Sequence, residues 1–323
     1  MSISTLSHTA AATPVADGLV LDRLHVHIPL PGTPRRWVHA ARDLTLHAPA
    51  GSITAVVGES GCGKSVLGLA AMGLLPGGTR VSGSIGIDGR NLLELDEREL
   101  ARVRGAGVGL VPQSAATHLT PVRTVGSVMA ESLRHHDLPH GPTAIDALLR
   151  HVQLPSHVRD DYPHELSGGM AQRVLVALTV ALGPTVLIAD EPTSALDDAT
   201  GRIVLDMLRA HADSGHAVVL ITHDLAAARS VADRVAVMYA GELLEVGPAD
   251  TVLRQPAHDY SRALLAALPE NGLVPPPGSP SSLVDPSPDV CAWHLRAGIT
   301  CDHRRLAPWR PGHDLACRPE GDR

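Results

Sequence analysis

The stretch "SITAVVGESGCGKS" (residues 52–65) predicts the centre of the fold. Its first half is a mostly apolar run typical of a buried strand. Its second half matches G-x-x-x-x-G-K-[ST] and leads into a helical run. Glycines let such a loop curl so that successive N–H groups point at phosphate oxygens, and the helix adds the positive end of its dipole. A glycine-rich turn with an incidental lysine is the alternative, and the flanking strand and helix argue against it. The stretch therefore predicts a nucleotide site.

Within this loop, two side chains have an expected partner. Lys64 would reach the β- and γ-phosphates, and the Ser65 hydroxyl would be a ligand of Mg²⁺. Cys62 is interpreted as a non-catalytic filler, although an exposed thiol there could be alkylated. The residues expected to contact the nucleotide are Gly58, Glu59, Ser60, Gly61, Cys62, Gly63, Lys64, Ser65 and Val66.

A second apolar run, "VLIADE" (residues 186–191), ends in two carboxylates. Asp190 at the end of this predicted strand can hold Mg²⁺ through water. Glu191, one residue further, is placed to polarise an attacking water as a general base. Such an ending often only caps the next helix. After a phosphate-binding loop, and followed by "PTSALD", it predicts the other half of the same site.

The stretch "ELSGGMAQR" (residues 165–173) places two glycines behind a serine at a predicted helix start. These groups offer a hydroxyl, accessible N–H groups and a helix N-terminus, which is again anion-binding chemistry. One such cradle is usually enough for one nucleotide. The second therefore suggests that the two motifs serve different nucleotides.

Composition narrows the class of protein. A formal net charge of −7 over 323 residues gives no basic face, so nucleic acid is a poor candidate partner. Four cysteines form no disulfide framework and fit a reducing compartment. The start of the chain lacks the pattern of a signal peptide. The most apolar run is broken at Gly183 and Pro184, which favours a buried helix and strand over a membrane span.

Strand-like and helical runs alternate along most of the chain, which predicts an α/β fold with a mainly parallel sheet. We expect a disordered N-terminus (1–17), one large domain (18–268), a Pro-rich linker (269–290) and a small Cys- and His-containing tail (291–323). Within the domain, about 95–182 is expected to be mostly helical, and a helix is expected over 64–75. The expected strands are 19–28, 44–48, 52–58, 83–89, 185–190, 217–222 and 234–247.

Six ordered motifs over about residues 18–268 resemble those of ABC transporter ATP-binding subunits. "GESGCGKS" resembles the Walker A loop and "VLIADE" the Walker B strand with its catalytic glutamate. "LSGGM" resembles the signature sequence, and "SALD", ending at Asp197, the D-loop. Gln113 in "LVPQS" and His223 in "ITHD" lie at the positions of the Q-loop glutamine and the switch histidine. The resemblance implies a P-loop ATPase with a RecA-like core, a helical signature subdomain and an antiparallel β subdomain.

The resemblance also implies roles for these residues. Two subunits would form a head-to-tail dimer around two ATPs, in which each ATP lies between one P-loop and the other subunit's signature. Glu191, His223 and Gln113 would then be catalytic, and Gln113 would sense the membrane partner. The Mg²⁺ ligands would be Ser65, Gln113 and Asp190. The signature residues Ser167, Gly168 and Gly169 would serve the partner subunit's ATP. Asp197 is also expected to be a nucleotide-binding residue.

Trp37 is the aromatic residue near the position where the family stacks adenine, and its ring could stack on the base. The surrounding "PLPGTPRRWVHAA" is expected to be an inserted loop, so the assignment stays open.

Further stretches, including "YPHELSGGMAQR" and "HDYSRALLAALP", resemble the peptide/nickel-type importers. This resemblance implies a second, different ATPase subunit, two membrane permease subunits and an extracytoplasmic solute-binding protein. The chain would lie at the cytoplasmic face of the membrane and power uptake of di- or oligopeptides. A nickel or metal-chelate importer is the alternative. A non-transport ABC ATPase is a further alternative, disfavoured by the acidic charge and single cassette. A module without activity is disfavoured by the intact motifs.

The tail departs from its relatives, which often end in four cysteines thought to hold an iron–sulfur cluster. Ala297 stands where the second cysteine would fall, and Cys291, Cys301 and Cys317 remain. A cluster or Zn²⁺ would need a histidine as fourth ligand, and the candidates are His294, His303 and His313. A tail without metal is the favoured interpretation.

Overall fold

The structure, a computed structural model, describes residues 17–32, 36–115, 118–194, 196–287, 290–301 and 305–317. The segment expected to be a disordered N-terminus lies outside the described residues except for Asp17. No helix in the described ranges is long and apolar enough to cross a membrane.

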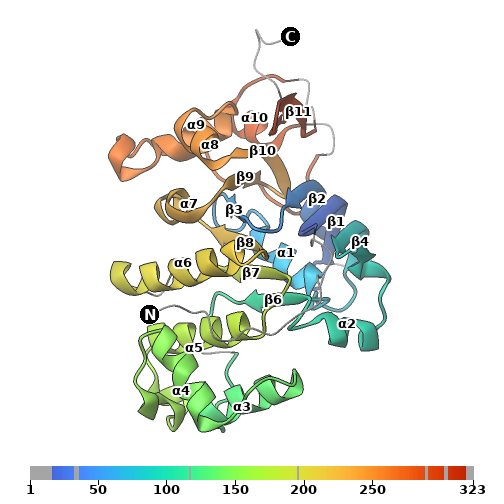
Figure 1. The fold of residues 1–323 in the computed structure, drawn as a ribbon. Coiled ribbons are helices and arrows are strands. Elements are labelled where there is room, and N and C mark those ends of the chain that lie inside the picture. The colour runs from blue at the N-terminus through green and yellow to red at the C-terminus, as the bar shows by residue number, and fades with distance from the viewer. Residues whose placement is uncertain are drawn as a thin grey trace.

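An eight-stranded sheet forms the centre of the fold, with strand order β11-β12-β10-β9-β3-β8-β7-β6 (Figure 1). The pairs from β9 through β3, β8 and β7 to β6 are parallel, and β10, β12 and β11 add antiparallel strands at one edge. The bounds of the strands are β3 (Ile53–Val57), β6 (Val108–Val111), β7 (Val186–Asp190), β8 (Ala217–Thr222), β9 (Arg234–Tyr239), β10 (Glu242–Pro248), β11 (Ala307–Arg310) and β12 (His313–Leu315). The α/β fold with a mainly parallel sheet is confirmed.

The inner strands are buried on both faces, as their unbroken apolar runs require. Alternate residues of β3 point to opposite sides. Ile53 and Val57 belong to a core that contains residues of α6 and α7, whereas Val56 belongs to a second core that contains residues of α1. The helices associated with this sheet are α1 (Lys64–Ala71), α2 (Glu97–Val103), α6 (Asp198–Asp213), α7 (Leu225–Val231), α8 (Ala249–Arg254), α9 (Asp259–Ala266) and α10 (Ala292–Ala297).

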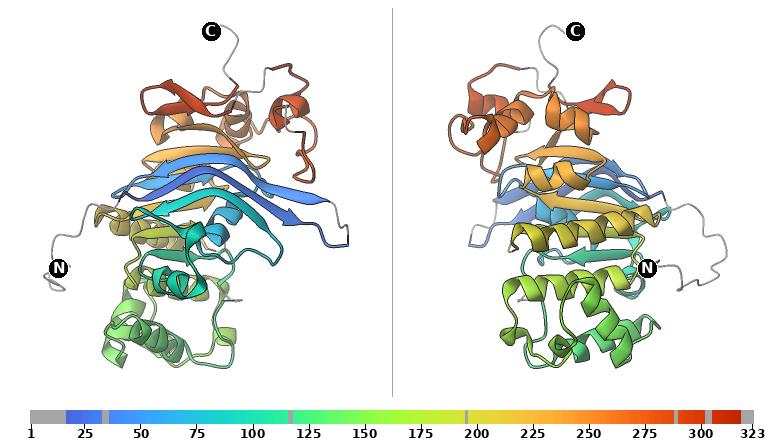
Figure 2. Two further views of the ribbon diagram at one scale, coloured as in Figure 1. Left: turned by 90° about the vertical axis from the view of Figure 1, so that its right-hand side faces the viewer. Right: turned by 60° about the vertical axis from the view of Figure 1, so that its left-hand side comes forward.

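A second sheet is antiparallel, with strand order β2-β1-β4-β5. Its long strands extend to one side past the rest of the molecule (Figure 2). The bounds are β1 (Leu19–Pro29), β2 (Trp37–Ala48), β4 (Arg80–Ile87) and β5 (Arg90–Asn91). The expected inserted loop is therefore partly wrong, because its second half, from Trp37, is the start of β2.

A helical region lies below the main sheet in Figure 1 and has its own hydrophobic core. It contains α3 (Val125–His135), α4 (Pro142–His151) and α5 (Gly168–Ala181). Short 3-10 turns occur here and elsewhere, at η1 (Leu92–Glu94), η3 (Ser156–Arg159), η4 (Pro163–Glu165) and η5 (Pro269–Asn271). The sequence pattern missed β6, a short edge strand inside the stretch that was expected to be mostly helical.

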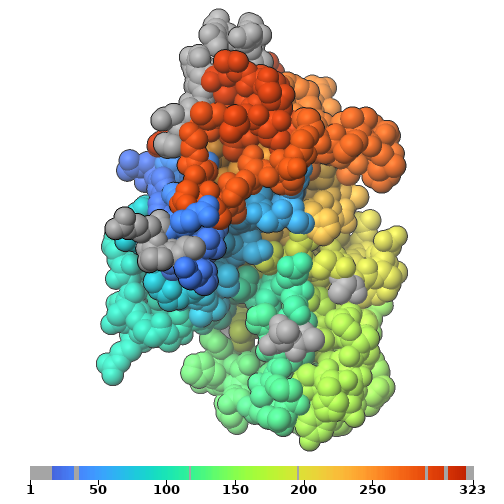
Figure 3. All heavy atoms as spheres, turned by 180° about the vertical axis from the view of Figure 1, so that it is seen from behind, coloured from blue at the N-terminus to red at the C-terminus, as the bar shows by residue number. Residues whose placement is uncertain are grey.

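The Pro-rich segment after α9 runs back along β2. The backbone N–H of His39 donates to the carbonyl of Leu283 at 2.8 Å, and Val38 forms a β-bridge with Val284. Figure 3 shows the orange C-terminal segment reaching the blue N-terminal strands. This part of the chain therefore contributes to the surface around the first strands.

A buried carboxylate joins the C-terminal elements. Glu245 on β10 is fully buried, and its Oε1 accepts a hydrogen bond from the N–H of Ala257 at 2.8 Å. Its Oε2 accepts at 3.0 Å from the N–H of His258, and His258 is the N-cap of α9. Nε2 of His313 on β12 lies 2.9 Å from Oε1. One side chain therefore ties β10, the start of α9 and β12 together.

We expect Glu245→Ala to lower the free energy of unfolding by roughly 3 kcal/mol, because it leaves two buried N–H groups and a buried histidine without their acceptor. Glu270→Ala is the control, since Glu270 forms a half-exposed ion pair with Arg229 and its loss should cost less than about 1 kcal/mol. Urea denaturation of both variants measures the difference. Equal losses would contradict a connecting role for Glu245.

Candidate nucleotide-binding site

The predicted phosphate loop lies between β3 and α1 and is closed by its own lysine. Lys64 is buried, and its Nζ donates hydrogen bonds to the carbonyls of Gly58 at 2.7 Å and Glu59 at 2.9 Å. The ammonium group therefore holds the first residues of the loop from inside.

Two of the loop glycines are required by close approach to other strands. A Cβ at Gly58 would lie 2.1 Å from the carbonyl oxygen of Met238 on β9. A Cβ at Gly63, which has a φ of +109°, would lie 2.1 Å from the carbonyl oxygen of Ala40 on β2. The loop is thus packed between the two sheets, and only glycine fits at either contact.

A cavity of about 360 Å³ opens above the loop, within the size range of small-molecule sites. It is lined by Ile28, Val38, Ala40, Ser60, Gly61, Gly63, Lys64, Ser65, Val66, Gln113, Glu191 and Leu283. Eight of these, from the loop and at positions 113 and 191, were predicted from the sequence. The apolar residues of β1 and β2 and Leu283 were missed, and only the apolar alternation of the strands could have indicated the first three.

Trp37 is not among the lining residues, and the guanidinium of Arg80 lies 4.3 Å from the centre of its ring. Its neighbour Val38 faces the cavity instead. Stacking of Trp37 on adenine stays a prediction.

Both predicted carboxylates lie at the end of β7. Asp190 is buried, its Oδ1 has no hydrogen-bond partner among the described residues, and burial raises the pKa of its carboxyl group. Glu191 adopts a φ of +48°, and its N–H donates to the carbonyl of Ile221 at 2.8 Å. This conformation turns the Glu191 carboxylate toward the cavity.

His223 follows β8 and contacts the same carboxylate. Its N–H donates to Oε1 of Glu191 at 3.1 Å, and its Nδ1 lies 2.7 Å from that oxygen. The Glu191 side chain is nearly buried, whereas that of His223 is 57% exposed. The neighbouring positions of β3, β8 and β7 in the sheet therefore bring together, at the carboxyl ends of these strands, three motifs that are far apart in sequence.

Cys62 was interpreted as a non-catalytic filler of the loop, with a thiol that could be alkylated if it were exposed. The residue is only 5% exposed, and burial raises the pKa of its thiol. A protonated, buried thiol is a weak nucleophile. Cys62 is therefore a packing residue at the back of the loop, in a position that the sequence alone did not reveal.

The signature residues and Asp197 do not line this cavity. Ser167 is the N-cap of α5, where its hydroxyl accepts from the N–H of Met170 at 3.2 Å. Gly168 is exposed, and a Cβ built on it would have nothing within 4 Å. Asp197 is exposed and caps α6 by accepting from the N–H of Thr200 at 2.9 Å.

Two residues outside the predicted motifs support the loop at Glu59. Its N–H donates to the hydroxyl of Tyr260 on α9 at 3.0 Å. Its Oε2 accepts from Nη1 of Arg296 on α10 at 2.7 Å. The stretch that contains Tyr260 was noticed only as part of the family resemblance, and no sequence signal pointed to these contacts.

Of the predicted tail ligands, the structure brings four together, namely Cys291, His294, Cys301 and Cys317. His313 lies elsewhere, against Glu245. His303 lies outside the described residues.

A curled glycine loop with its lysine, two strand-end carboxylates and a histidine beside one of them define a P-loop nucleoside-triphosphate hydrolase. Comparison with known proteins narrows this class. A protein-family model described as "ABC transporter" matches residues 41–194.

The probable D,D-dipeptide transport ATP-binding protein DdpD of Escherichia coli (strain K12) is 38% identical over 92% of this chain and 98% of its own length. The dipeptide transport ATP-binding protein DppD of Bacillus subtilis (strain 168) is 37% identical over 82% of this chain and 84% of its own. Among solved structures, a dimeric bacterial ABC transporter cassette matches with a TM-score of 0.63 and 25% identity, over 72% of this chain and 98% of that chain.

The chain therefore belongs to the family of ABC transporter ATP-binding proteins, and it is an ATPase. The family resemblance, the fold and the enzyme class expected from the sequence are confirmed.

We expect Gly63→Ala to destabilise the nucleotide-free protein strongly, because the new methyl group would collide with the carbonyl of Ala40. Gly61→Ala is the matched control. Gly61 has a φ of +79° but nothing within 4 Å of a built Cβ, so it should cost only the backbone strain of about 1–2 kcal/mol. Thermal unfolding without nucleotide compares them. A larger loss for Gly61→Ala would contradict the clamped loop.

Proposed function

We propose that this chain is the ATP-hydrolysing subunit of an importer that takes up di- or oligopeptides. The family membership supports the ATPase role, and the dipeptide transport relatives, similar over most of their length, support the peptide class of solute. The observation that carries the proposal is the Glu191 carboxylate, which lines the loop cavity while His223 holds one of its oxygens.

In the proposed site, the amides of the loop and the Lys64 ammonium bind the phosphates of ATP. Ser65, Gln113 and Asp190 would hold Mg²⁺, which would neutralise phosphate charge. The buried Oδ1 of Asp190 fits this assignment, because a carboxylate oxygen without a partner is costly unless a cation or water satisfies it.

Glu191 acts as the general base in this proposal. Its carboxylate accepts a proton from the attacking water, and its position at the cavity wall suits that task. The contacts from the N–H and Nδ1 of His223 fix the carboxylate and place the imidazole beside the site of charge development.

The signature residues serve a second subunit. Ser167 and Gly168 are exposed, and neither they nor Asp197 line the chain's own cavity. A helix start with an available hydroxyl and N–H groups can complete the phosphate site of a partner cassette. A solved cassette with this fold is dimeric, which supports the arrangement. We propose a different ATPase chain as that partner.

The remaining partners are two permease subunits and an extracytoplasmic solute-binding protein, with this chain at the cytoplasmic face of the membrane. Gln113 is exposed at the cavity mouth, where it can report nucleotide state to a permease. The test is ATPase activity of the assembled transporter in lipid vesicles, with binding protein and either short peptides or chelated nickel. Stimulation by peptides supports the proposal. Stimulation by nickel alone would mean that the solute is a metal chelate and not a peptide. Activity that does not depend on the membrane subunits would overturn the transport role.

We expect Glu191→Gln to lower ATP turnover by at least about 100-fold while nucleotide binding is retained, because the amide cannot accept the water's proton. Glu94→Gln is the control, since Glu94 is exposed and does not line the cavity. Phosphate release and fluorescent-nucleotide titration separate the two effects. Normal turnover in Glu191→Gln would refute the assigned base.

Ser167→Arg and Lys64→Ala should affect opposite nucleotides in the assembled transporter. The first should abolish photolabelling of the partner ATPase by an azido-ATP probe, and the second should abolish labelling of this chain. The reverse pattern would contradict the proposed exchange of signatures.

A further inference from the structure

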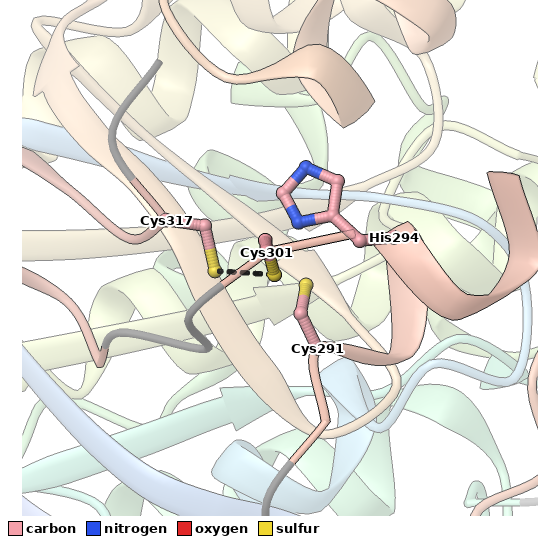
Figure 4. Close-up of side chains that lie close together, drawn as sticks. All are labelled: Cys291, His294, Cys301 and Cys317. Atoms are coloured by element: carbon pink, nitrogen blue, oxygen red, sulfur yellow. Dashed lines mark hydrogen bonds between the residues drawn. The ribbon is translucent and has the colours of Figure 1, made fainter. Parts of the chain in front are cut away.

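We propose that Cys291, His294, Cys301 and Cys317 bind one zinc ion, and that this ion fixes α10 against the nucleotide-binding loop. Figure 4 shows the three sulfurs and the imidazole converging on one another. The residues come from the N-cap and body of α10, the segment after it, and the segment just after β12.

The separation of the ligand atoms suits one ion. One ligand atom from each of the four residues lies within 4.8 Å of all the others, and Sγ of Cys301 lies 3.9 Å from Sγ of Cys317. Tetrahedral ligands at the usual Zn–S length of about 2.3 Å lie about 3.8 Å apart. Small side-chain movements therefore complete the coordination. Three thiolates and one imidazole are a closed structural zinc set.

His294 is oriented for this role by a second residue. Its Nε2 lies 3.2 Å from Oδ2 of Asp259 on α9. Its Nδ1 is buried and has no oxygen or nitrogen partner in the described part of the chain, and Figure 4 shows one ring nitrogen turned toward the sulfurs. A carboxylate that holds the far nitrogen of a metal-binding histidine is a usual arrangement at zinc sites.

The four-cysteine iron–sulfur cluster suggested by the family resemblance does not fit these residues. One of its cysteines is replaced by Ala297, and His294 supplies the fourth ligand atom instead. A cubane cluster distributes its ligands over four irons, so it requires ligand atoms further apart than those around a single ion. The close spacing of the ligand atoms therefore favours a single zinc ion over a cluster.

The zinc site and the nucleotide loop share one short helix. α10 has only six residues, too few to be stable alone, so its position depends on tertiary contacts. It carries two of the ligands and also Arg296, whose buried guanidinium donates to Glu59 of the loop and to the hydroxyl of Tyr239 at 3.2 Å. A metal that fixes α10 therefore also fixes Arg296, the residue that supports Glu59.

Metal analysis of the full chain, purified without chelator, tests the site. We expect one zinc per chain and no acid-labile sulfide, with zinc lost in Cys301→Ser and Cys317→Ser. Cys62→Ser is the thiol control and should keep its zinc, because Cys62 lies outside the cluster. Stoichiometric iron and sulfide would overturn zinc in favour of a cluster. A metal-free chain, with thiols or a disulfide at these positions, would overturn metal binding altogether.

A second measurement tests the coupling to the loop. Arg296→Gln should keep its zinc but bind ATP about tenfold more weakly, the effect of losing one charge-assisted hydrogen bond. Chelation of the zinc in the unaltered protein should lower both the melting temperature and ATP affinity. Unchanged ATP affinity in both cases would overturn the anchoring role while leaving the metal site intact.

Discussion

The whole arrangement depends on the close contact of the nucleotide loop with two sheets. Gly58 lies against the backbone of β9 and Gly63 against the backbone of β2, at distances that leave no room for a side chain. Lys64 then closes the loop from inside through two carbonyls. The loop presents N–H groups to the cavity, and the contacts with β9, β2 and Lys64 hold it from the opposite side. Its shape is consequently set before any nucleotide binds, and the entropic cost of ordering it on binding is small.

The rest of the site lies at the carboxyl ends of the parallel strands. The carboxyl ends of parallel strands lie on the same side of the sheet, so the residues that follow β3, β7 and β8 meet although they are far apart in sequence. The positive φ of Glu191 directs its carboxylate to the cavity, and the contact with His223 across the neighbouring strand holds it there. Asp190, one residue earlier, stays within the buried strand. The two adjacent carboxylates are both buried, and Glu191 is the one that lines the cavity.

The fold class and the motifs could be predicted from the sequence because each rests on local pattern, such as the apolar runs of β3 and β7 with polar residues at their ends. What the sequence did not reveal depends on long-range contacts. The burial of Cys62 follows from packing against other strands, and the start of β2 at Trp37 follows from pairing with β1. Leu283 reaches the cavity only because its segment pairs with β2. The short strand β6 exists through its pairing with β7, which a local pattern of four residues does not indicate.

The two halves of the proposed composite site are held very differently. The loop is clamped by both sheets and supported at Glu59 by Tyr260 and Arg296 from the C-terminal elements. The signature rests on α5, where Ser167 has the support of its own helix cap and is open to its surroundings. Through the contacts at Glu59, the C-terminal elements support the chain's own phosphate loop. In the proposed pairing with a different ATPase, the tail would therefore act on the composite ATP site that contains this loop.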